Sequence, residues 1–279
     1  MTAQGYREQS SVGRFFSEMR RGARNQGNVV FALIFKELKN RSGGDGYGLY
    51  SLAVIALEPA IAVAGMAVFF YFLRRAEIAG VHIALFLAVS YLPYGLVRRS
   101  MTSVPKVLKS NAAFYAYQQV KPIDSVLSRF IIETTLVLFG GVIVFFLLWW
   151  FLDLKPNFDH IAELIGIFAM MVVTSFGLCL FLATYGTRFP VILRVSSGTS
   201  RALYFLSAVI HPMSEIHDTA GEFLLWNPLA HMVELLRDYA LGMEPYAGVT
   251  LSYPLGFMLF MLFLGLTSYY ANRFELLKK

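Results

Sequence analysis

The chain of 279 residues is 57% hydrophobic and only 15% charged, and its formal net charge at neutral pH is +6. Soluble domains average about 25% charged residues. The composition therefore excludes a soluble enzyme and a disordered chain, and it predicts an all-α integral membrane protein. A single cysteine, Cys179, excludes a disulfide framework and any cysteine-based metal cluster.

The N-terminal region is polar and basic before any long apolar run begins. Residues 1–27 contain five arginines, and we expect them to form a basic cytoplasmic tail that is not a signal peptide. In residues 28–41, apolar side chains recur every three or four positions, with Lys36 and Glu37 on the other side. This periodicity predicts an amphipathic helix that lies in the cytoplasmic interface of the membrane.

The rest of the chain contains six apolar segments, which predict six transmembrane helices in one domain over residues 49–273. A membrane-crossing helix needs about 20 mostly apolar residues. Four segments contain an uncharged stretch of that length, the first carries Glu58, and the fifth carries Arg194 and Arg201. The expected segments are 49–73, 78–97, 130–152, 162–187, 189–212 and 250–272.

The basic residues predict the orientation of these helices. Of the 24 lysines and arginines, 20 fall in the two terminal regions and in the loops on the same side as them. Because cytoplasmic loops are enriched in Lys and Arg, we expect both termini in the cytoplasm. The positive charge is then a topology signal and does not indicate a nucleic-acid partner. The acidic loop 212–250 contains short apolar pieces, which we expect to form re-entrant or periplasmic helices.

No motif for a chemical reaction is present. The chain lacks a phosphate-binding GxxxxGK[ST] loop, a GxSxG motif and an HExxH motif. His211, Glu215 and His217 do not have the spacing of a helical metal site. We therefore expect no catalytic residue, no metal site and no cofactor on this chain. We expect it to move a substrate with energy taken from elsewhere.

Several short motifs resemble those of one group of transporters. The string NPLAH at 227–231, followed by Arg237, is similar to a signature of ABC-2 type exporter membrane subunits. The string VKPID at 120–124 and the pair Glu58-Pro59 resemble the capsular polysaccharide branch. From residue 28 to the C-terminus, the chain resembles the KpsM family, the permease subunits of capsular polysaccharide ABC exporters.

The resemblance implies partners and a location. Two such chains would form a homodimer in the inner membrane of a Gram-negative bacterium, with two copies of a separate ABC ATPase that binds ATP and Mg. The substrate would be a lipid-linked acidic capsular polysaccharide, passed on to a periplasmic adaptor and an outer-membrane polysaccharide exporter. The alternatives are an ABC-2 permease for O-antigen, teichoic acid or lipid, and a membrane-bound polymer synthase.

The substrate pathway is expected to use the charged and aromatic residues of the spans. Glu58 either contacts substrate or pairs with a buried partner such as Arg129 or Arg201 and holds the helices together. Arg194 and Arg201 are seven residues apart and share a helix face, which could attract an anionic polymer. The candidate pathway residues are Glu58, Tyr91, Tyr94, Arg194, Arg201 and Tyr204.

Two further groups of candidates lie outside the spans. Residues 110–120 are expected to form a short coupling helix whose aromatics dock on the ATPase, together with residues of the interfacial helix. The candidate coupling residues are Lys36, Glu37, Arg41, Asn111, Phe114, Tyr115, Tyr117, Lys121 and Asp124. The resemblance implies a periplasmic gate at Trp226, Asn227, Pro228, His231, Glu234 and Arg237. Within it, Glu234 and Arg237 are three apart and are placed to pair with each other.

Overall fold

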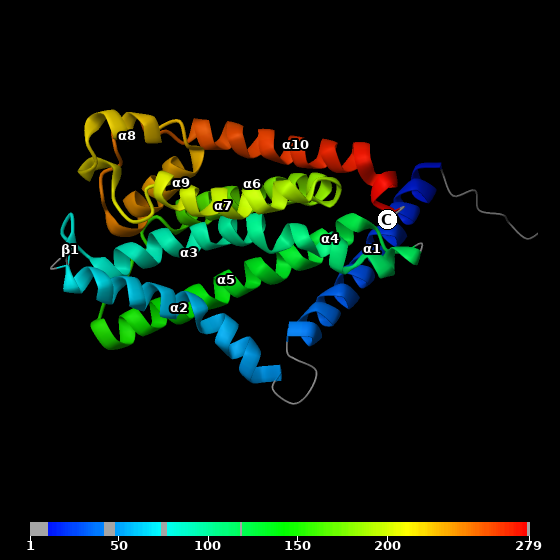
Figure 1. Cartoon of the computed structure of the whole chain (residues 1–279), viewed down its shortest axis with the longest axis horizontal. Coiled ribbons are helices and arrows are strands. Elements are labelled where there is room, and N and C mark those ends of the chain that lie inside the picture. The colour runs from blue at the N-terminus through cyan, green and yellow to red at the C-terminus, as the bar shows by residue number, and fades with distance from the viewer. Residues whose placement is uncertain (1–10, 42–47, 74–76, 118, 278–279) are drawn as a thin grey trace, which may run out of the picture.

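A computed structural model describes residues 11–41, 48–73, 77–117 and 119–277, and these residues form an elongated helical bundle (Figure 1). Long helices run lengthwise through its body, and another long helix crosses one of its ends. The helices are α1 (Ser11–Arg41), α2 (Gly48–Phe72), α3 (Ile83–Thr102), α4 (Val107–Ser110), α5 (Pro122–Leu152), α6 (Ile161–Arg188), α7 (Pro190–Leu206), α8 (Asp218–Leu224), α9 (Pro228–Leu241) and α10 (Ser252–Leu277). Short 3-10 turns lie at Val104–Lys106, Ala112–Ala116 and Met213–Glu215, and strands β1 (Glu77–Ile78) and β2 (Val81–His82) form a hairpin.

A helix occupies each of the six expected transmembrane positions, but several boundaries differ from the prediction. The third helix, α3, begins at residue 83 instead of 78, because a hairpin precedes it and the His82 ring accepts the backbone N–H of Ala84. It also continues through Arg98 and Arg99, since both arginines have carboxylate partners. Among the described residues, only α5, α6 and α10 are long and apolar enough to cross a membrane by composition alone.

The boundaries of α5 and α7 show the same dependence on local capping. Helix α5 begins eight residues before the expected span 130–152, because Pro122 opens the helix and the Asp124 carboxylate accepts the Lys121 backbone N–H. The predicted end of the fifth segment at 212 is also too late. Helix α7 ends at Leu206, and Ala208 takes a positive φ of 53° directly after it.

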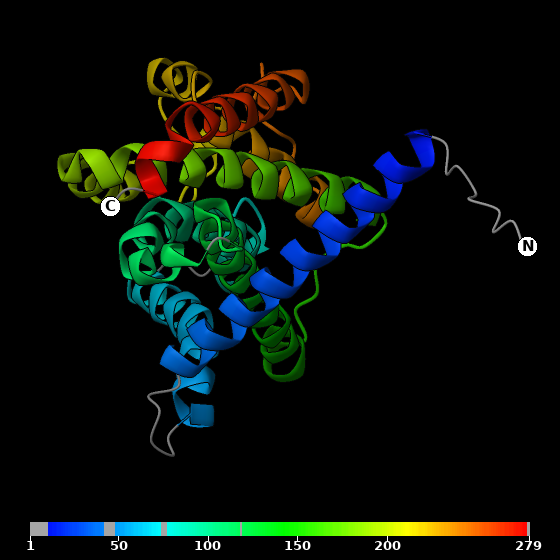
Figure 2. The same cartoon turned by 90° about the vertical axis from the view of Figure 1, so that its right-hand side faces the viewer.

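The first helix is longer than the sequence pattern predicts. An amphipathic helix was expected over residues 28–41, after a tail, but α1 begins at Ser11. Its residues 17–28 are exposed, and its second half crosses the end of the bundle where α4 and the start of α5 lie (Figure 2). The helical stretch 11–27 therefore corrects the expectation of a plain tail, and residues 1–10 lie outside the described part of the chain.

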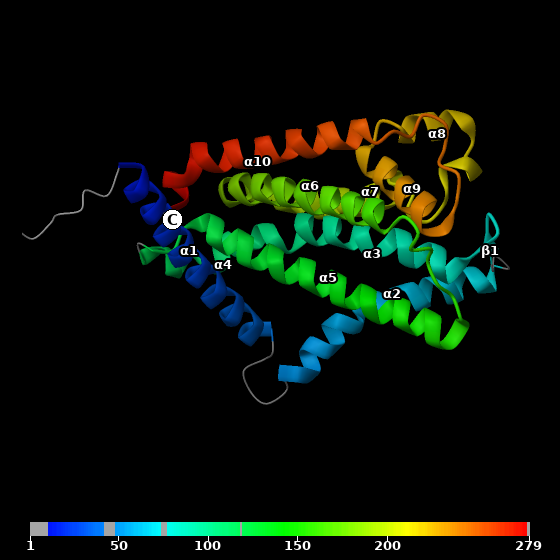
Figure 3. The same ribbon diagram turned by 180° about the vertical axis from the view of Figure 1, so that it is seen from behind.

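Helix α2 is bent, and its first half leaves the bundle on the side of α1 (Figure 3). Pro59 lies inside this helix and removes one backbone hydrogen bond, which accounts for the bend. By contrast, α6 and α10 run in close contact. A Cβ on Gly177 would lie 2.3 Å from the Met261 carbonyl oxygen, so only a small residue permits this approach.

The loops that were expected on opposite sides of the membrane lie at opposite ends of the bundle. The hairpin, α8 and α9 lie at one end, whereas α1, α4 and the C-terminal end of α10 lie at the other (Figure 1). The predicted short helices of the 212–250 loop are present as α8 and α9. Most of α9 is buried, from Pro228 to Arg237, so this segment is a packed part of the bundle.

Candidate functional site

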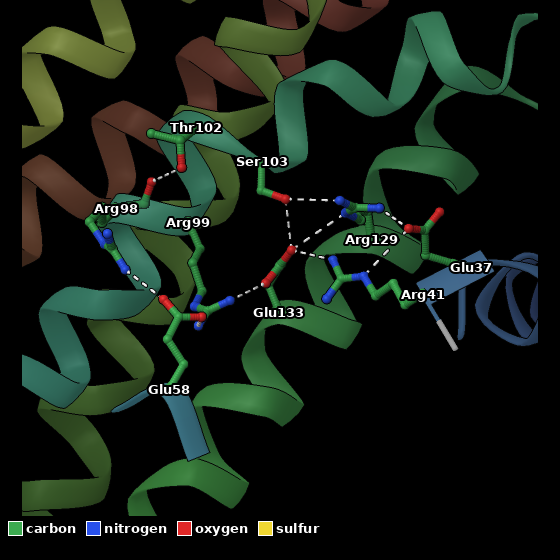
Figure 4. Close-up of polar contacts among 9 residues, drawn as sticks. All are labelled: Glu37, Arg41, Glu58, Arg98, Arg99, Thr102, Ser103, Arg129 and Glu133. Carbon is green, nitrogen blue, oxygen red and sulfur yellow. Dashed lines mark hydrogen bonds and ion pairs between the residues drawn. The ribbon is translucent and has the colours of Figure 1, made fainter. Parts of the chain in front are cut away.

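A network of charged side chains joins four helices at the α1 end of the bundle (Figure 4). Its centre is Glu133 of α5, whose side chain is 1% exposed. The Glu133 carboxylate lies 2.5 Å from Arg41 Nη2 of α1 and 3.2 Å from Arg99 Nη1 of α3. It also accepts the Ser103 hydroxyl at 2.8 Å. One buried carboxylate thus holds guanidinium groups from two other helices.

Two further carboxylates extend the network on either side of Glu133. Arg129, one turn before Glu133 on α5, pairs with Glu37 of α1 and lies 3.4 Å from Glu133. On the other side, Arg99 Nη2 lies 2.7 Å from the Glu58 carboxylate of α2. The chain of contacts therefore runs from α1 through α5 and α3 to the bent helix α2.

Glu58 does not pair with Arg129 or Arg201, the partners considered from the sequence. Its carboxylate bonds Arg99 at 2.7 Å and Arg98 at 3.2 Å, and its side chain remains 48% exposed. This pairing arises because α3 continues to Thr102, beyond the expected end of the segment at residue 97. The arginine pair therefore reaches the bend of α2.

The sequence analysis missed Glu133, Arg98 and Arg99 as site residues. A signal was present in the spacing, because Arg129 and Glu133 are four residues apart on one helix. Two adjacent arginines at the end of an apolar run also indicate a nearby acid, since such charges are costly without partners.

A second contact joins α1 to the segment that was expected to couple to an ATPase. The Lys36 ammonium lies 2.5 Å from Asn111 Oδ1 and 4.1 Å from the centre of the Phe114 ring. Further along, Gln26 Nε2 donates to the Asp124 carboxylate at 2.8 Å. The structure thus brings together two groups of candidates that are far apart in the sequence.

The predicted coupling helix is broken into α4 and the 3-10 turn Ala112–Ala116. Three of the candidate coupling residues are buried inside this chain: Glu37 of α1, Asn111, and Asp124 of α5. Lys36, Arg41, Phe114 and Tyr115 are half-buried, and burial raises the pKa of Tyr115 to about 12. Tyr117, which is 66% exposed, and Lys121 present free surface to a partner.

The three candidate tyrosines form a cluster between α3 and α7. The Tyr204 ring contacts those of Tyr91 and Tyr94, with centroids 6.0 and 5.5 Å apart. The Tyr204 hydroxyl reaches Met66 Sδ of α2 at 2.9 Å, and the Tyr94 hydroxyl donates to the Ser200 carbonyl. Tyr94 is fully buried, so in this conformation its role is to fix α7 against α3.

Arg194 and Arg201 lie on the outer face of α7. Both are exposed, and neither forms an ion pair with another residue in the described part of the chain. Ser196 and Ser200 are the buried residues on the opposite side of this helix. The two arginines therefore share one accessible face, whereas Tyr204, another candidate pathway residue of α7, turns into the bundle.

The candidate gate residues hold α9 in place between α7 and α10. Asn227 caps α9 through the Leu229 backbone N–H and donates to the Leu206 carbonyl of α7. The His231 ring accepts the Thr250 backbone N–H at 3.0 Å, and its Nε2 lies 2.9 Å from the Leu225 carbonyl oxygen. These contacts give the polar residues of the NPLAH string a local structural explanation.

Arg237 completes this arrangement from the far end of α9. It is 1% exposed and pairs with Glu234 at 3.0 Å, as the spacing of the two residues predicted. It also donates to the carbonyls of Ala208 and His211, just after α7, and lies over the Phe86 ring. Burial lowers the pKa of Arg237 to about 10 despite the Glu234 charge. Pro228 is buried at the start of α9, whereas Trp226 is 80% exposed.

Most of the chain matches the model of a known protein family. The model of the family described as ABC-2 type transporter matches residues 28–241. The matched range begins in the second half of α1 and ends with α9, so it contains the charge network, the coupling segment and the gate residues.

Individual relatives agree with this family. The chain is 28% identical to the polysialic acid transport protein KpsM of Escherichia coli, over 90% of this chain and 95% of that protein. It is 22% identical to the capsule polysaccharide export inner-membrane protein BexB of Haemophilus influenzae, over 78% of this chain and 80% of that protein. It is also 22% identical to CtrC of Neisseria meningitidis serogroup A, a protein with the same description, over 76% of this chain and 78% of CtrC.

Proposed function

Because this chain belongs to the ABC-2 type transporter family, we propose that it is the permease subunit of an ATP-driven exporter of lipid-linked acidic capsular polysaccharide. The observation that carries this proposal is the near full-length similarity to a polysialic acid transporter, together with two capsule export proteins from other species. The chain is a permease and not an enzyme, and ATP hydrolysis takes place on a separate ATPase subunit.

The membrane topology that fits this function has six spans and both termini in the cytoplasm of a Gram-negative cell. Support comes from the six helices at the expected positions. It also comes from the basic residues of the sequence, because α1, α4 and the C-terminal end of α10 lie at one end of the bundle (Figure 1). The inner membrane is also where the named relatives BexB and CtrC reside. In this topology, α8 and α9 face the periplasm and α1 lies along the cytoplasmic surface.

Cysteine labelling tests the orientation, because the single native cysteine is buried. In a Cys179→Ser background, Lys155→Cys between α5 and α6 should react with a membrane-impermeant thiol reagent from the periplasm. Lys109→Cys at the end of α4 should react only after the inner membrane is opened. The reverse pattern would invert the proposed topology.

The contacts at the α1 end suggest how ATP hydrolysis on a partner could move the transmembrane helices. An ATPase that engages Tyr117 and Lys121 would shift the coupling segment, to which Lys36 of α1 is bonded. The charge network would pass that shift from α1 through Glu133 to Glu58 and the bent helix α2. We place two copies of this chain and two ATPase subunits in the complex, with a periplasmic adaptor and an outer-membrane exporter beyond it.

The outer face of α7 supports an anionic substrate. Arg194 and Arg201 are exposed there, and two copies facing each other would line a path with four positive charges. Tyr91, next to this helix and half-buried, is available to stack on sugar rings.

The deciding experiment is to delete the gene in its capsulated host and locate the polysaccharide by cell fractionation. Polymer that accumulates in the cytoplasm while total synthesis continues would establish export. Loss of the polymer would indicate a polymer synthase instead. A normal surface capsule would exclude capsule as the substrate and leave O-antigen, teichoic acid or lipid for the same assay.

A further inference from the structure

A polar cavity of about 440 Å³ lies between α1 and the segment that follows α3. Its charged lining consists of Lys36 and Glu37 from α1, Lys106 from the 3-10 turn and Arg129 from α5. The uncharged polar residues of the lining are Asn40, Thr102, Ser103 and Ser110. The lining therefore carries three cationic groups and one carboxylate.

These charges are not balanced within the described chain. Arg129 has Glu37 and Glu133 as partners. Lys36 has no carboxylate partner among the described residues, because its ammonium contacts only the Asn111 amide oxygen and the Phe114 ring. Lys106 likewise forms no ion pair in that part of the chain, and it is exposed at the cavity. Two positive charges therefore border an open space without a counter-ion from the described residues.

Partial burial makes this arrangement unfavourable for the chain alone. Burial lowers the pKa of Lys36, which means that its charged form is destabilised where it stands. An anion in the cavity would reverse this penalty and could accept hydrogen bonds from both ammonium groups. The cavity is larger than one phosphate group needs, so it also has room for the polar part of a headgroup.

The face of α1 that carries Phe31 and Phe35 indicates what kind of anion reaches the cavity. Phe31 and Phe35 are 61% and 59% exposed and contact each other edge to face. In an interfacial helix, such a pair enters the apolar layer, and the polar face then lies at the level of the lipid headgroups. At that depth the most abundant anions are the phosphates of lipids.

We propose that this cavity binds the phosphate group of an anionic phospholipid, with Lys36 and Lys106 as its cationic contacts. This inference does not depend on the identity of the exported substrate. Bound lipid would fasten α1 to the 3-10 turn Val104–Lys106, which precedes the coupling segment, because Lys36 comes from the former and Lys106 from the latter.

Lipid binding to the purified full-length chain, measured by native mass spectrometry, tests the proposal. Phosphatidylglycerol should bind more tightly than phosphatidylcholine. Lys106→Gln should weaken phosphatidylglycerol binding about tenfold, the effect of one charge-assisted hydrogen bond. Lys109→Gln is the matched control, since Lys109 is also exposed and three residues away but lines a different cavity. It should change binding less than about twofold, as expected for a screened surface charge.

Each other outcome contradicts the proposal. Equal losses in the Lys106 and Lys109 variants would mean that only the general positive charge attracts lipid. Equal binding of the two lipids would exclude an anion site. Displacement of phosphatidylglycerol by inorganic phosphate at equal concentration would show a free-phosphate site and exclude the lipid as its occupant. Lys36→Gln provides a second variant if Lys106→Gln does not fold, and the same tenfold loss is expected.

Discussion

Replacement of Glu133 by Gln removes the carboxylate at the centre of the charge network while it keeps the shape of the side chain. Glu133 is 1% exposed and contacts Arg41, Arg99 and Arg129, so the change leaves three guanidinium groups close together without their shared counter-ion. Removal of one partner from a buried ion pair costs about 3–5 kcal/mol. We expect a loss of stability of that size.

The same change at Glu58 is the matched control. Glu58 also pairs with two arginines, but its side chain is 48% exposed, so the lost interaction lies at the surface of the bundle and not in its interior. Exposed pairs contribute about 1 kcal/mol or less. The two variants therefore separate the effect of burial from the effect of charge.

Thermal unfolding of the purified chain in one detergent is the assay. In large domains, a loss of about 1 kcal/mol in unfolding free energy lowers the melting temperature by about 2–4 °C. Glu133→Gln should therefore lower the apparent Tm by roughly 10 °C, and Glu58→Gln should lower it by a few degrees at most. A second substitution, Arg41→Gln, should restore part of the loss in Glu133→Gln because it removes one unpaired cation. Equal shifts for Glu133→Gln and Glu58→Gln, or no rescue, would refute the idea that Glu133 is a buried counter-ion.

Three further substitutions address the coupling surface, the substrate path and the α9 contacts. Tyr117→Ala should reduce transport-coupled ATP hydrolysis about tenfold or more without a change in Tm, since the side chain is exposed and an aromatic anchor is lost; normal coupling would remove Tyr117 from the ATPase contact. Arg201→Glu should reduce export of the anionic polymer about tenfold while the ATPase still co-purifies, and unchanged export would contradict the charged pathway. Arg237→Met should destabilise the chain by about 3–5 kcal/mol, measured by thermal unfolding, because Glu234 is then buried without its partner. A stability equal to the parent would show that this pair contributes nothing to the packing of α9.

The sequence by itself determined the class of the protein and the approximate positions of its long helices. Long apolar runs require a membrane or a large core, and this requirement is independent of how the runs pack. The pairing of Glu234 with Arg237 was also readable, because both lie on one helix at a spacing that brings side chains together. The family followed from short strings whose order along the chain is distinctive.

Only the tertiary structure decided which charges meet across helices. Glu58 pairs with Arg98 and Arg99 instead of Arg129, since the choice depends on how far α3 extends and where α2 bends. Lys36 contacts Asn111 because α1 packs against the coupling segment. The two residues are 75 positions apart, and nothing in the sequence indicates that they are in contact. Periodicity places a side chain on a face of its own helix, but the packing of that helix against the others decides what the face contacts.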